Sequence, residues 1–306
     1  MTSINRNILA TLAYFDMFSY PLTRVEILLY LQQKYYQPDV DAALRYMVAS
    51  RAIYRFGDYY TLRNDPTLIS RRITGNRKAG ELIKIAHRVS DLLIRFPYVR
   101  GIAISGSLSK NYADDESDVD LFIITAKNRL WIARSFMHLL KKLSFLFNKQ
   151  HYFCMNYYVD EEQLEITEKN IYTAIEVVTL MPLQGDSVFE SFYAENTWTQ
   201  VFLPNNYLRV STAKPVKTFW LKSAVEFLLN SKLGCMLDRM LMRITSKKWQ
   251  KKTQEKATNM HGFVLGMIAE QHCSKPDPIN FQKHLLNNYN NKVHGVLEST
   301  EHIVAN

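Results

Sequence analysis

The sequence predicts an α+β fold in which a short mixed sheet is flanked by helical regions. The evidence for the sheet is two apolar segments, 99–105 and 119–125, whose lengths are typical of buried strands. On both sides of them, apolar residues recur at the three- and four-residue spacing of helices. The chain has 306 residues, 47% hydrophobic and 12% aromatic, which is enough for two or three domains with their own cores. We place the boundaries at 1–65, 66–98, 99–204 and 205–306.

Residues 1–65 are expected to form a winged-helix-like unit of three helices and a hairpin. The first helix covers 5–18, and Thr23 with Glu26 three positions later forms a capping box that starts the second. A third helix is expected at 38–50. Two short apolar segments then flank the two-residue turn Gly57-Asp58, which is the pattern of a β-hairpin.

A winged helix commonly binds DNA through its third helix, and the sequence argues against that role here. Asp39 and Asp41 lie at the start of the third helix, where phosphates would repel their carboxylates. We therefore expect DNA not to be read by this unit, and expect the unit to pack or to dock a protein. A long connecting helix at 66–98 follows, with Arg71, Arg72, Arg77 and Lys78 near its start as solvated charges.

The functional prediction depends on the stretch 99–125. An apolar strand is followed by the turn Ser105-Gly106-Ser107, a short helix, and a second strand that begins with Asp118 and Asp120. Because side chains alternate along a strand, we expect these two carboxylates to point the same way. Paired carboxylates suit Mg²⁺ or Mn²⁺, and a glycine turn lets backbone N–H groups approach a phosphate. Together they indicate a site for a nucleoside triphosphate.

These residues, Gly106-Ser107, Lys110 and Ser117-Asp118-Val119-Asp120, resemble the motif of the polymerase-beta-like nucleotidyltransferase superfamily. The resemblance covers residues 99–160, with Lys110-Asn111 in place of the more usual Arg-Gly. It implies a polymerase-beta-like core, catalytic and metal-binding roles for Asp118 and Asp120, and Mg²⁺ or Mn²⁺ as cofactor. It also implies that Gly106, Ser107, Lys110 and Ser117 bind the nucleotide.

The superfamily commonly takes a third carboxylate from the strand after the next helix, and this sequence departs from that pattern. A helix is expected at 129–147 and a strand at 151–159, where Asn156 occupies the possible third-ligand position. An amide binds metal weakly and cannot accept a proton. The general base could then be Asp160, Glu161, Glu176 or a group of the substrate.

Beyond residue 160 the chain is expected to be helical. Pro182 and Gly185-Asp186 indicate a loop between two helices, and three more helices are expected in an α-helical C-terminal region, at 216–230, 233–245 and 255–271. Lysines are densest at 247–256, where Lys248, Lys251 and Lys252 would share one helix face. That face suits RNA or another phosphate-rich partner, and a solvated face is the simpler interpretation.

Composition narrows the class of protein further. The net charge of +9 favours an anionic ligand or partner. The three cysteines have neither disulfide nor zinc spacing, and no segment is long and apolar enough to span a membrane. We therefore expect a cytoplasmic protein with no membrane partner.

The sequence thus predicts a metal-dependent nucleotidyltransferase that moves an NMP from an NTP to a hydroxyl or amine acceptor and releases pyrophosphate. The acceptor could be a small molecule, a protein or RNA. Two alternatives stay open. A nucleotide-binding regulatory protein of weak or no activity would use the same site, and a nucleic-acid-binding protein would use the winged helix and the lysine-rich helix.

Overall fold

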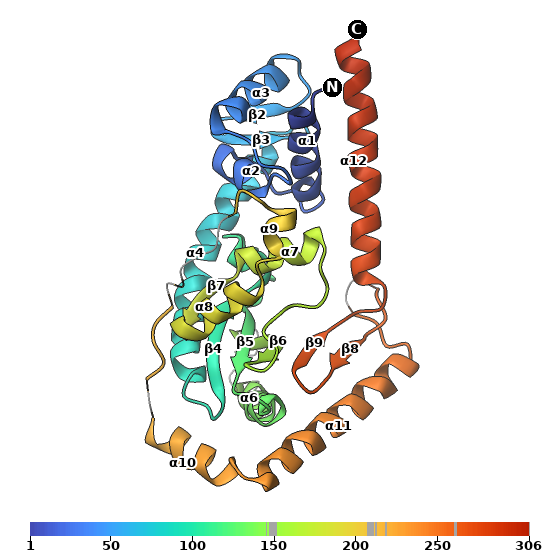
Figure 1. Cartoon of the computed structure of the whole chain (residues 1–306). Helices are drawn as coiled ribbons and strands as arrows, with labels where there is room; N and C mark the ends of the chain where they lie inside the picture. Colours follow the sequence, from blue (N-terminus) through green and yellow to red (C-terminus); the bar gives the residue numbers. More distant parts are fainter. Residues whose placement is uncertain are drawn as a thin grey trace.

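A computed structural model describes residues 1–144, 146, 152–206, 211, 213–217, 219–259 and 262–305, the last four by their backbone alone. It confirms a mixed α+β architecture, with a small N-terminal unit at one end, a six-stranded sheet in the middle and two helices along the opposite end (Figure 1). Phe147 and His151, the predicted ends of one helix and one strand, lie outside the described residues. In the part of the chain that is described, no helix is long and apolar enough to cross a membrane.

The helices and the hairpin predicted for the N-terminal unit are confirmed. They are α1 (Ser3–Asp16), α2 (Arg24–Tyr30) and α3 (Gln37–Ala49), with a sheet of order β1 (Leu22–Thr23), β3 (Tyr59–Thr61), β2 (Tyr54–Phe56). The capping box also forms, because the Thr23 side chain accepts from the Glu26 backbone N–H and Glu26 accepts from the Thr23 N–H at 2.8 Å. Local signals were sufficient to specify this unit.

Helix α4 (Thr67–Leu93) connects the N-terminal unit to the sheet, and one of its arginines is not the solvated charge that was predicted. Arg72 is buried, donates to the Pro21 carbonyl at 2.8 Å and pairs with Glu26 at 2.7 Å. Its guanidinium also lies 3.7 Å from the centre of the Tyr20 ring. Because these partners lie on α2 and in the loop before β1, Arg72 fastens α4 to the N-terminal unit.

The central sheet has the order β7-β4-β5-β6-β9-β8 and is mixed, as predicted. Strand β4 (Val99–Ile104) runs antiparallel to β5 (Asp120–Thr125), and the short α5 (Gly106–Ser109) lies between them in the chain. Helix α6 (Leu130–Ser144) then crosses to β6 (Cys154–Asp160), which is parallel to β5. The turn after β4 and the first residue of β5 are therefore brought to the same edge.

The predicted loop around Pro182 is wrong, because an edge strand, β7 (Met181–Gln184), occupies this position between α7 (Ile171–Thr179) and α8 (Asp186–Glu195). Proline is tolerated in an edge strand, where one side of the backbone has no partner. Gly185 ends the strand with φ of +87°, and a Cβ there would lie 2.2 Å from the Arg100 carbonyl oxygen. The short α9 (Thr199–Phe202) follows α8.

The prediction of an entirely α-helical C-terminal region is also wrong. Helices α10 (Trp220–Leu229) and α11 (Lys232–Gln254) are followed by a hairpin, β8 (Met267–Ala269) and β9 (Cys273–Pro276), where a helix was predicted at 255–271. Gly262 has a left-handed φ of +79°, and Gly266 approaches the Asp277 carbonyl so closely that a Cβ would lie 2.2 Å from its oxygen. The apolar residues after Gly262 therefore extend the sheet, with β9 against β6.

The last helix, α12 (Phe281–Ala305), runs from the hairpin back along α1, so the two termini lie at the same end of the molecule (Figure 1). Tyr289 packs edge to face on Tyr14, with the ring centres 5.6 Å apart, and Lys292 pairs with Asp16 at 2.5 Å. The C-terminal region is thus joined both to the central sheet and to the N-terminal unit.

Candidate functional site

A cavity of about 360 Å³ lies at the edge of the sheet where β5 begins. The turn after β4, the first residues of β5 and β6, and one face of α7 form three of its sides. The segment from β9 to the start of α12 forms the fourth. The polar and aromatic residues that line it include Ser105, Gly106, Asp120, Asn156, Tyr157, Tyr172, Glu176, Lys275, Phe281 and Gln282.

Gly106 and Asp120 are in direct contact at the edge of this cavity. Gly106 has a left-handed φ of +67°, and a Cβ at this position would lie 2.7 Å from Asp120 Oδ2. The preceding residue, Ser105, donates its N–H to the Asp120 carbonyl at 2.9 Å. The two parts of the sequence motif are thus adjacent in space, and only glycine allows the turn to approach the carboxylate this closely.

Asp120 is a half-buried carboxylate that lies close to other negative charges. Its pKa is raised to about 6, chiefly because it is buried, and the charges of Asp118 and Glu176 raise it further. The hydrogen bond that Asn156 Nδ2 donates to Asp120 acts in the opposite direction and holds the carboxylate in place. A divalent cation beside Asp120 would favour its ionised form and neutralise the surrounding carboxylates.

Asp118 lies outside strand β5, which begins at Asp120, so the expectation that both carboxylates project from one strand is wrong. Asp118 occupies the loop before the strand, is exposed, and is not among the residues that line the cavity. Its negative charge still contributes to raising the pKa of the Asp120 carboxyl. The pair is therefore electrostatically coupled without being equivalent.

Lys110 lies next to Gly106 and the cavity wall. Its Nζ donates to the Gly106 carbonyl at 3.0 Å and to Glu176 Oε1 at 2.8 Å. The Tyr20 hydroxyl of the N-terminal unit donates to the Lys110 carbonyl. The ammonium thus links the turn after β4 to helix α7.

Two other predicted nucleotide-binding residues lie farther from the cavity wall. Ser107 is exposed at the start of α5. Ser117 Oγ donates to Asp114 Oδ1 at 2.7 Å and accepts from the Asp114 N–H at 2.8 Å, so it closes the turn before β5. Neither side chain is among the residues that line the cavity.

The three candidate bases differ sharply in their surroundings. Asp160 is fully buried, and its carboxylate lies 3.0 Å from His272 Nδ1 and accepts from the Asn128 N–H at 2.8 Å. Glu161 is exposed and does not line the cavity. Glu176, on α7, does line it. Position therefore favours Glu176.

Asn156 holds Asp120 rather than presenting an oxygen beside it. Its Nδ2 donates to Asp120 Oδ1 at 2.8 Å, and its Oδ1 accepts from Cys154 Sγ at 3.4 Å. Lys141 Nζ in turn lies 3.8 Å from the Cys154 sulfur. This chain of contacts fixes the orientation of the carboxylate from the β6 side.

Asp120, Glu176 and Asp277 are the carboxylates among the residues that line the cavity beside β5, and Asp118 is not one of them. Within the described residues, no group of three or more His, Cys, Asp or Glu side chains is arranged to hold one. Mg²⁺ commonly takes one or two protein carboxylates and completes its shell with phosphate oxygens and water. Asp120, with Asp118 in the loop before it, would offer a metal ion that number of carboxylates, and the ion would need the nucleotide as a further ligand.

Sequence reasoning missed the wall of the cavity that comes from the C-terminal region. Lys275 on β9 is buried, pairs with Glu168 at 2.6 Å and lies 5.3 Å from the centre of the Tyr157 ring. Phe281 and Gln282 come from the start of α12. No local pattern marks these residues, because more than a hundred positions separate them from β5 and β6 and only the hairpin brings them there.

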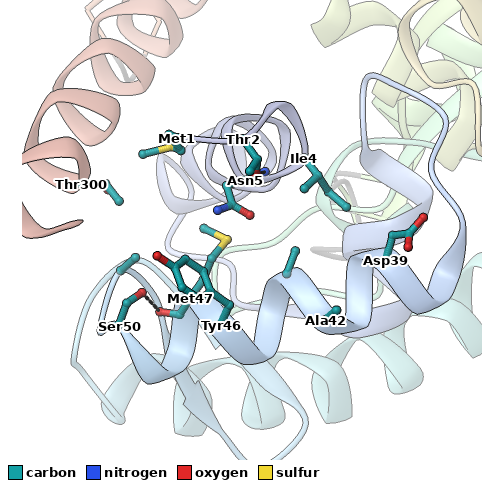
Figure 2. Close-up of a pocket in the computed structure, with 12 residues that line it drawn as sticks. Met1, Thr2, Ile4, Asn5, Asp39, Ala42, Tyr46, Met47, Ser50 and Thr300 are labelled. Carbon is teal, nitrogen blue, oxygen red and sulfur yellow. Dashed lines mark hydrogen bonds between the residues drawn. The ribbon is translucent and has the colours of Figure 1, made fainter. Parts of the chain in front are cut away.

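A second cavity, of about 760 Å³, lies between α1, α3 and the far end of α12 (Figure 2). Its lining is formed mainly by apolar and small residues such as Ile4, Ala43 and Met47. Asp39 is the only charged side chain among the lining residues, and no lysine or arginine is present. This cavity is therefore unsuited to a phosphate, and the cavity beside β5 is the candidate site.

Comparisons of the chain with protein-family models, with curated proteins and with solved structures found no match. The function must therefore be argued from the cavity beside β5 itself.

Proposed function

We propose that the protein is a metal-dependent nucleotidyltransferase that transfers an NMP from an NTP to a hydroxyl or amine acceptor and releases pyrophosphate. The observation that carries the proposal is the contact between Gly106 and Asp120 at the cavity edge. A phosphate that approaches the Gly106 turn is at once beside the Asp120 carboxylate. Phosphate and cation would therefore meet at one point, as phosphoryl transfer requires.

In this proposal Asp118 and Asp120 hold Mg²⁺ or Mn²⁺. The bound cation would supply charge stabilisation at the α-phosphate and the leaving pyrophosphate. The Gly106 backbone, Ser107 and Lys110 bind the outer phosphates, and Ser117 supports the loop that carries Asp118. Asn156 orients Asp120 through its amide nitrogen.

Glu176 is the proposed general base for the acceptor. Its Oε1 accepts from Lys110, so Oε2 is the atom that would take the acceptor proton. The aromatic side chains of Tyr157, Tyr172 and Phe281 line the same cavity and provide flat apolar surfaces for a base or an aromatic acceptor.

One observation favours a second candidate function, a nucleotide-binding regulator without turnover. The ion pair of 2.8 Å between Lys110 and Glu176 engages both a phosphate-binding cation and the proposed base. If the pair persists when nucleotide binds, Lys110 is withheld from the phosphate and its charge weakens Glu176 as a base. Binding would then occur without chemistry.

A paired assay tests both functions. Binding of each NTP with Mn²⁺ is measured by calorimetry, and pyrophosphate release is measured with a cell extract as the source of acceptor. We expect wild-type protein to bind and turn over at least one NTP, and Asp120→Asn to lose both. The control, Glu116→Gln, removes an exposed carboxylate four residues away and should behave like wild type. Equal binding by wild type and Asp120→Asn would contradict the proposed site, whereas binding without turnover would establish the regulator.

A further inference from the structure

Helix α10 has the reverse of the usual polarity of a surface helix, because its charged side chains face the protein. Lys222 is buried and donates to the carbonyl oxygens of Ile94 at 2.9 Å and Val99 at 2.7 Å. Glu226 pairs with Arg100 at 2.8 Å. These contacts fasten the inner face of α10 to the end of α4 and the start of β4.

The outer face of α10 is apolar. Four large side chains that share this face are between 60% and 82% exposed, namely Trp220, Leu221, Phe227 and Leu228. A helix that covers a core normally turns such residues inward and its charges outward. The helix cannot simply rotate to bury its apolar face, because the buried contacts of Lys222 and Glu226 fix its orientation.

Helix α11 continues the same arrangement. Its inner face is fastened to α6, since Asp238 Oδ1 accepts from the Ile132 N–H at 2.9 Å. On its outer face, residues at helical spacing are between 50% and 73% exposed, namely Leu233, Met236, Met240 and Ile244. The exposed apolar side chains of α11 therefore form a stripe of about three turns along this helix.

The two helices meet in a tight corner. Gly234 approaches the Leu229 carbonyl so closely that a Cβ would lie 1.8 Å from its oxygen. Both helices lie along the end of the molecule opposite the N-terminal unit (Figure 1). We call the eight exposed apolar side chains of α10 and α11 the α10–α11 surface.

Positive charge lines the α11 part of this surface, and the first exposed carboxylate after α11 is Glu255, 3.8 Å from Lys251. Lys232, Arg239 and Arg243 flank the stripe on α11, and Lys247, Lys248 and Lys251 continue it toward the end of the helix; all six are exposed. The two helices are described throughout, and their only carboxylates are Glu226 and Asp238, which face the protein.

We propose that the α10–α11 surface binds the surface of an anionic lipid bilayer. Exposed Trp, Phe, Leu and Met beside Lys and Arg are the composition of interfacial helices, whose apolar face enters the boundary between headgroups and acyl chains. The cations would lie at the level of anionic headgroups. A patch of this kind on a water-facing helix marks an interaction site.

The charge of the α10–α11 surface distinguishes between three possible partners: a second copy of the chain, RNA and an anionic bilayer. A second copy of this face would place six cations against six cations, which disfavours a symmetric dimer. RNA would pair with the lysines and leave the eight apolar side chains in water. Lipid adsorption needs no membrane-spanning helix, and it replaces the sequence-based expectation of no membrane partner.

The test is co-sedimentation of the full-length protein with vesicles of phosphatidylcholine alone or mixed with phosphatidylserine. We expect binding to the mixed vesicles only, weakened by salt. Arg243→Gln/Lys247→Gln/Lys251→Gln should weaken the partition about a hundredfold, at about one kcal/mol for each cation near the membrane. Trp220→Ser/Phe227→Ser should weaken it by more than about tenfold. Tyr36→Ser, which removes an 81% exposed aromatic ring from the N-terminal unit, is the matched control and should bind like wild type.

Trp220→Phe provides a second readout. It keeps an apolar ring, so it should bind vesicles while losing the blue shift of Trp220 emission that wild type shows on binding. Absence of binding to the mixed vesicles would overturn the proposal. Two further results would do the same: RNA binding without vesicle binding, or a lipid-free dimer that Trp220→Ser/Phe227→Ser dissociates.

Discussion

The cavity beside β5 and the α10–α11 surface depart from ordinary packing in opposite directions. In the cavity, the carboxylate of Asp120 is half-buried, and its pKa is raised to about 6. On α10, Trp220 and Phe227 are each 82% exposed while Lys222 is buried. At both places, a side chain of the opposite polarity would be expected to give a more stable folded state. Under the two proposals, each of these unfavourable placements would be compensated by a bound ligand.

The two regions also differ in the ligand that they suit. The cavity is small, carries negative charge and is approached by a glycine turn, so it fits a cation with a phosphate. The α10–α11 surface is long, apolar and positive, so it fits an extended anionic surface. Substitutions in the cavity and on the α10–α11 surface should therefore affect different properties of the protein.

Glu176→Gln should reduce turnover by about a hundredfold to ten thousandfold, because it removes the proposed general base. Binding of NTP should change little, since Lys110 is then freed for phosphate. Steady-state kinetics and calorimetry measure the two effects. Glu165→Gln, which breaks the exposed Lys169–Glu165 pair, is the control and should leave turnover unchanged. Unaltered turnover in Glu176→Gln would remove this residue from the mechanism.

Gly106→Ala should reduce turnover by about tenfold to a hundredfold. The left-handed φ of +67° strains any other residue by about 1–2 kcal/mol, and the added methyl would press on Asp120 Oδ2. The matched control is Gly80→Ala, because a Cβ at Gly80 meets nothing within 4 Å. Wild-type kinetics in Gly106→Ala would show that this turn does not position the carboxylate.

Asp120→Asn should make the protein more stable at pH 7, by about 3 kcal/mol at most. The folded-state pKa of Asp120 is raised from 3.8 to about 6, so the folded state binds more protons than the unfolded state between these values. Stability therefore falls as pH rises through this window, and the asparagine variant avoids that loss. Denaturant unfolding at pH 7 should show the gain, which should vanish below pH 4. A destabilised variant at pH 7 would contradict the raised pKa of this carboxyl.

Trp220→Ser/Phe227→Ser should change the free energy of unfolding by less than about 0.5 kcal/mol, because side chains this exposed add little to the folded state. Leu121→Ala, at a fully buried position, should cost about 2–5 kcal/mol in the same experiment. Comparable losses for both variants would mean that the α10–α11 surface is part of the core, and the comparison would fail.

The sequence was most informative where the determining contacts are local. The Thr23–Glu26 capping box and the hairpin around Gly57-Asp58 formed as predicted. Gly106 and Asp120 were expected to share an edge, and the antiparallel pairing of β4 with β5 brings them together. These features depend on hydrogen bonds or pairings between residues that are close in the chain.

Long-range packing accounts for what the sequence did not specify. The apolar residues after Gly262 are compatible with a helix or a strand. They form a strand because β9 pairs with β6. Lys275 and Phe281 reach the cavity only through that pairing. On α10, helical periodicity predicts that Trp220 and Phe227 share a face, and it does not say whether that face lies inside or outside. The buried contacts of Lys222 decide it.

Nucleotide transfer is the central claim, and one measurement tests it most directly. The four NTPs, each radiolabelled at the α-phosphate, are incubated with the protein, Mg²⁺ or Mn²⁺ and a cell extract, with Asp118→Ala/Asp120→Ala as the comparison. We predict that wild-type protein attaches label from at least one NTP to a component of the extract, and that the double variant attaches none. Label transfer by both proteins alike, or no transfer and no NTP binding by wild type, would contradict a nucleotidyltransferase site at Asp118 and Asp120.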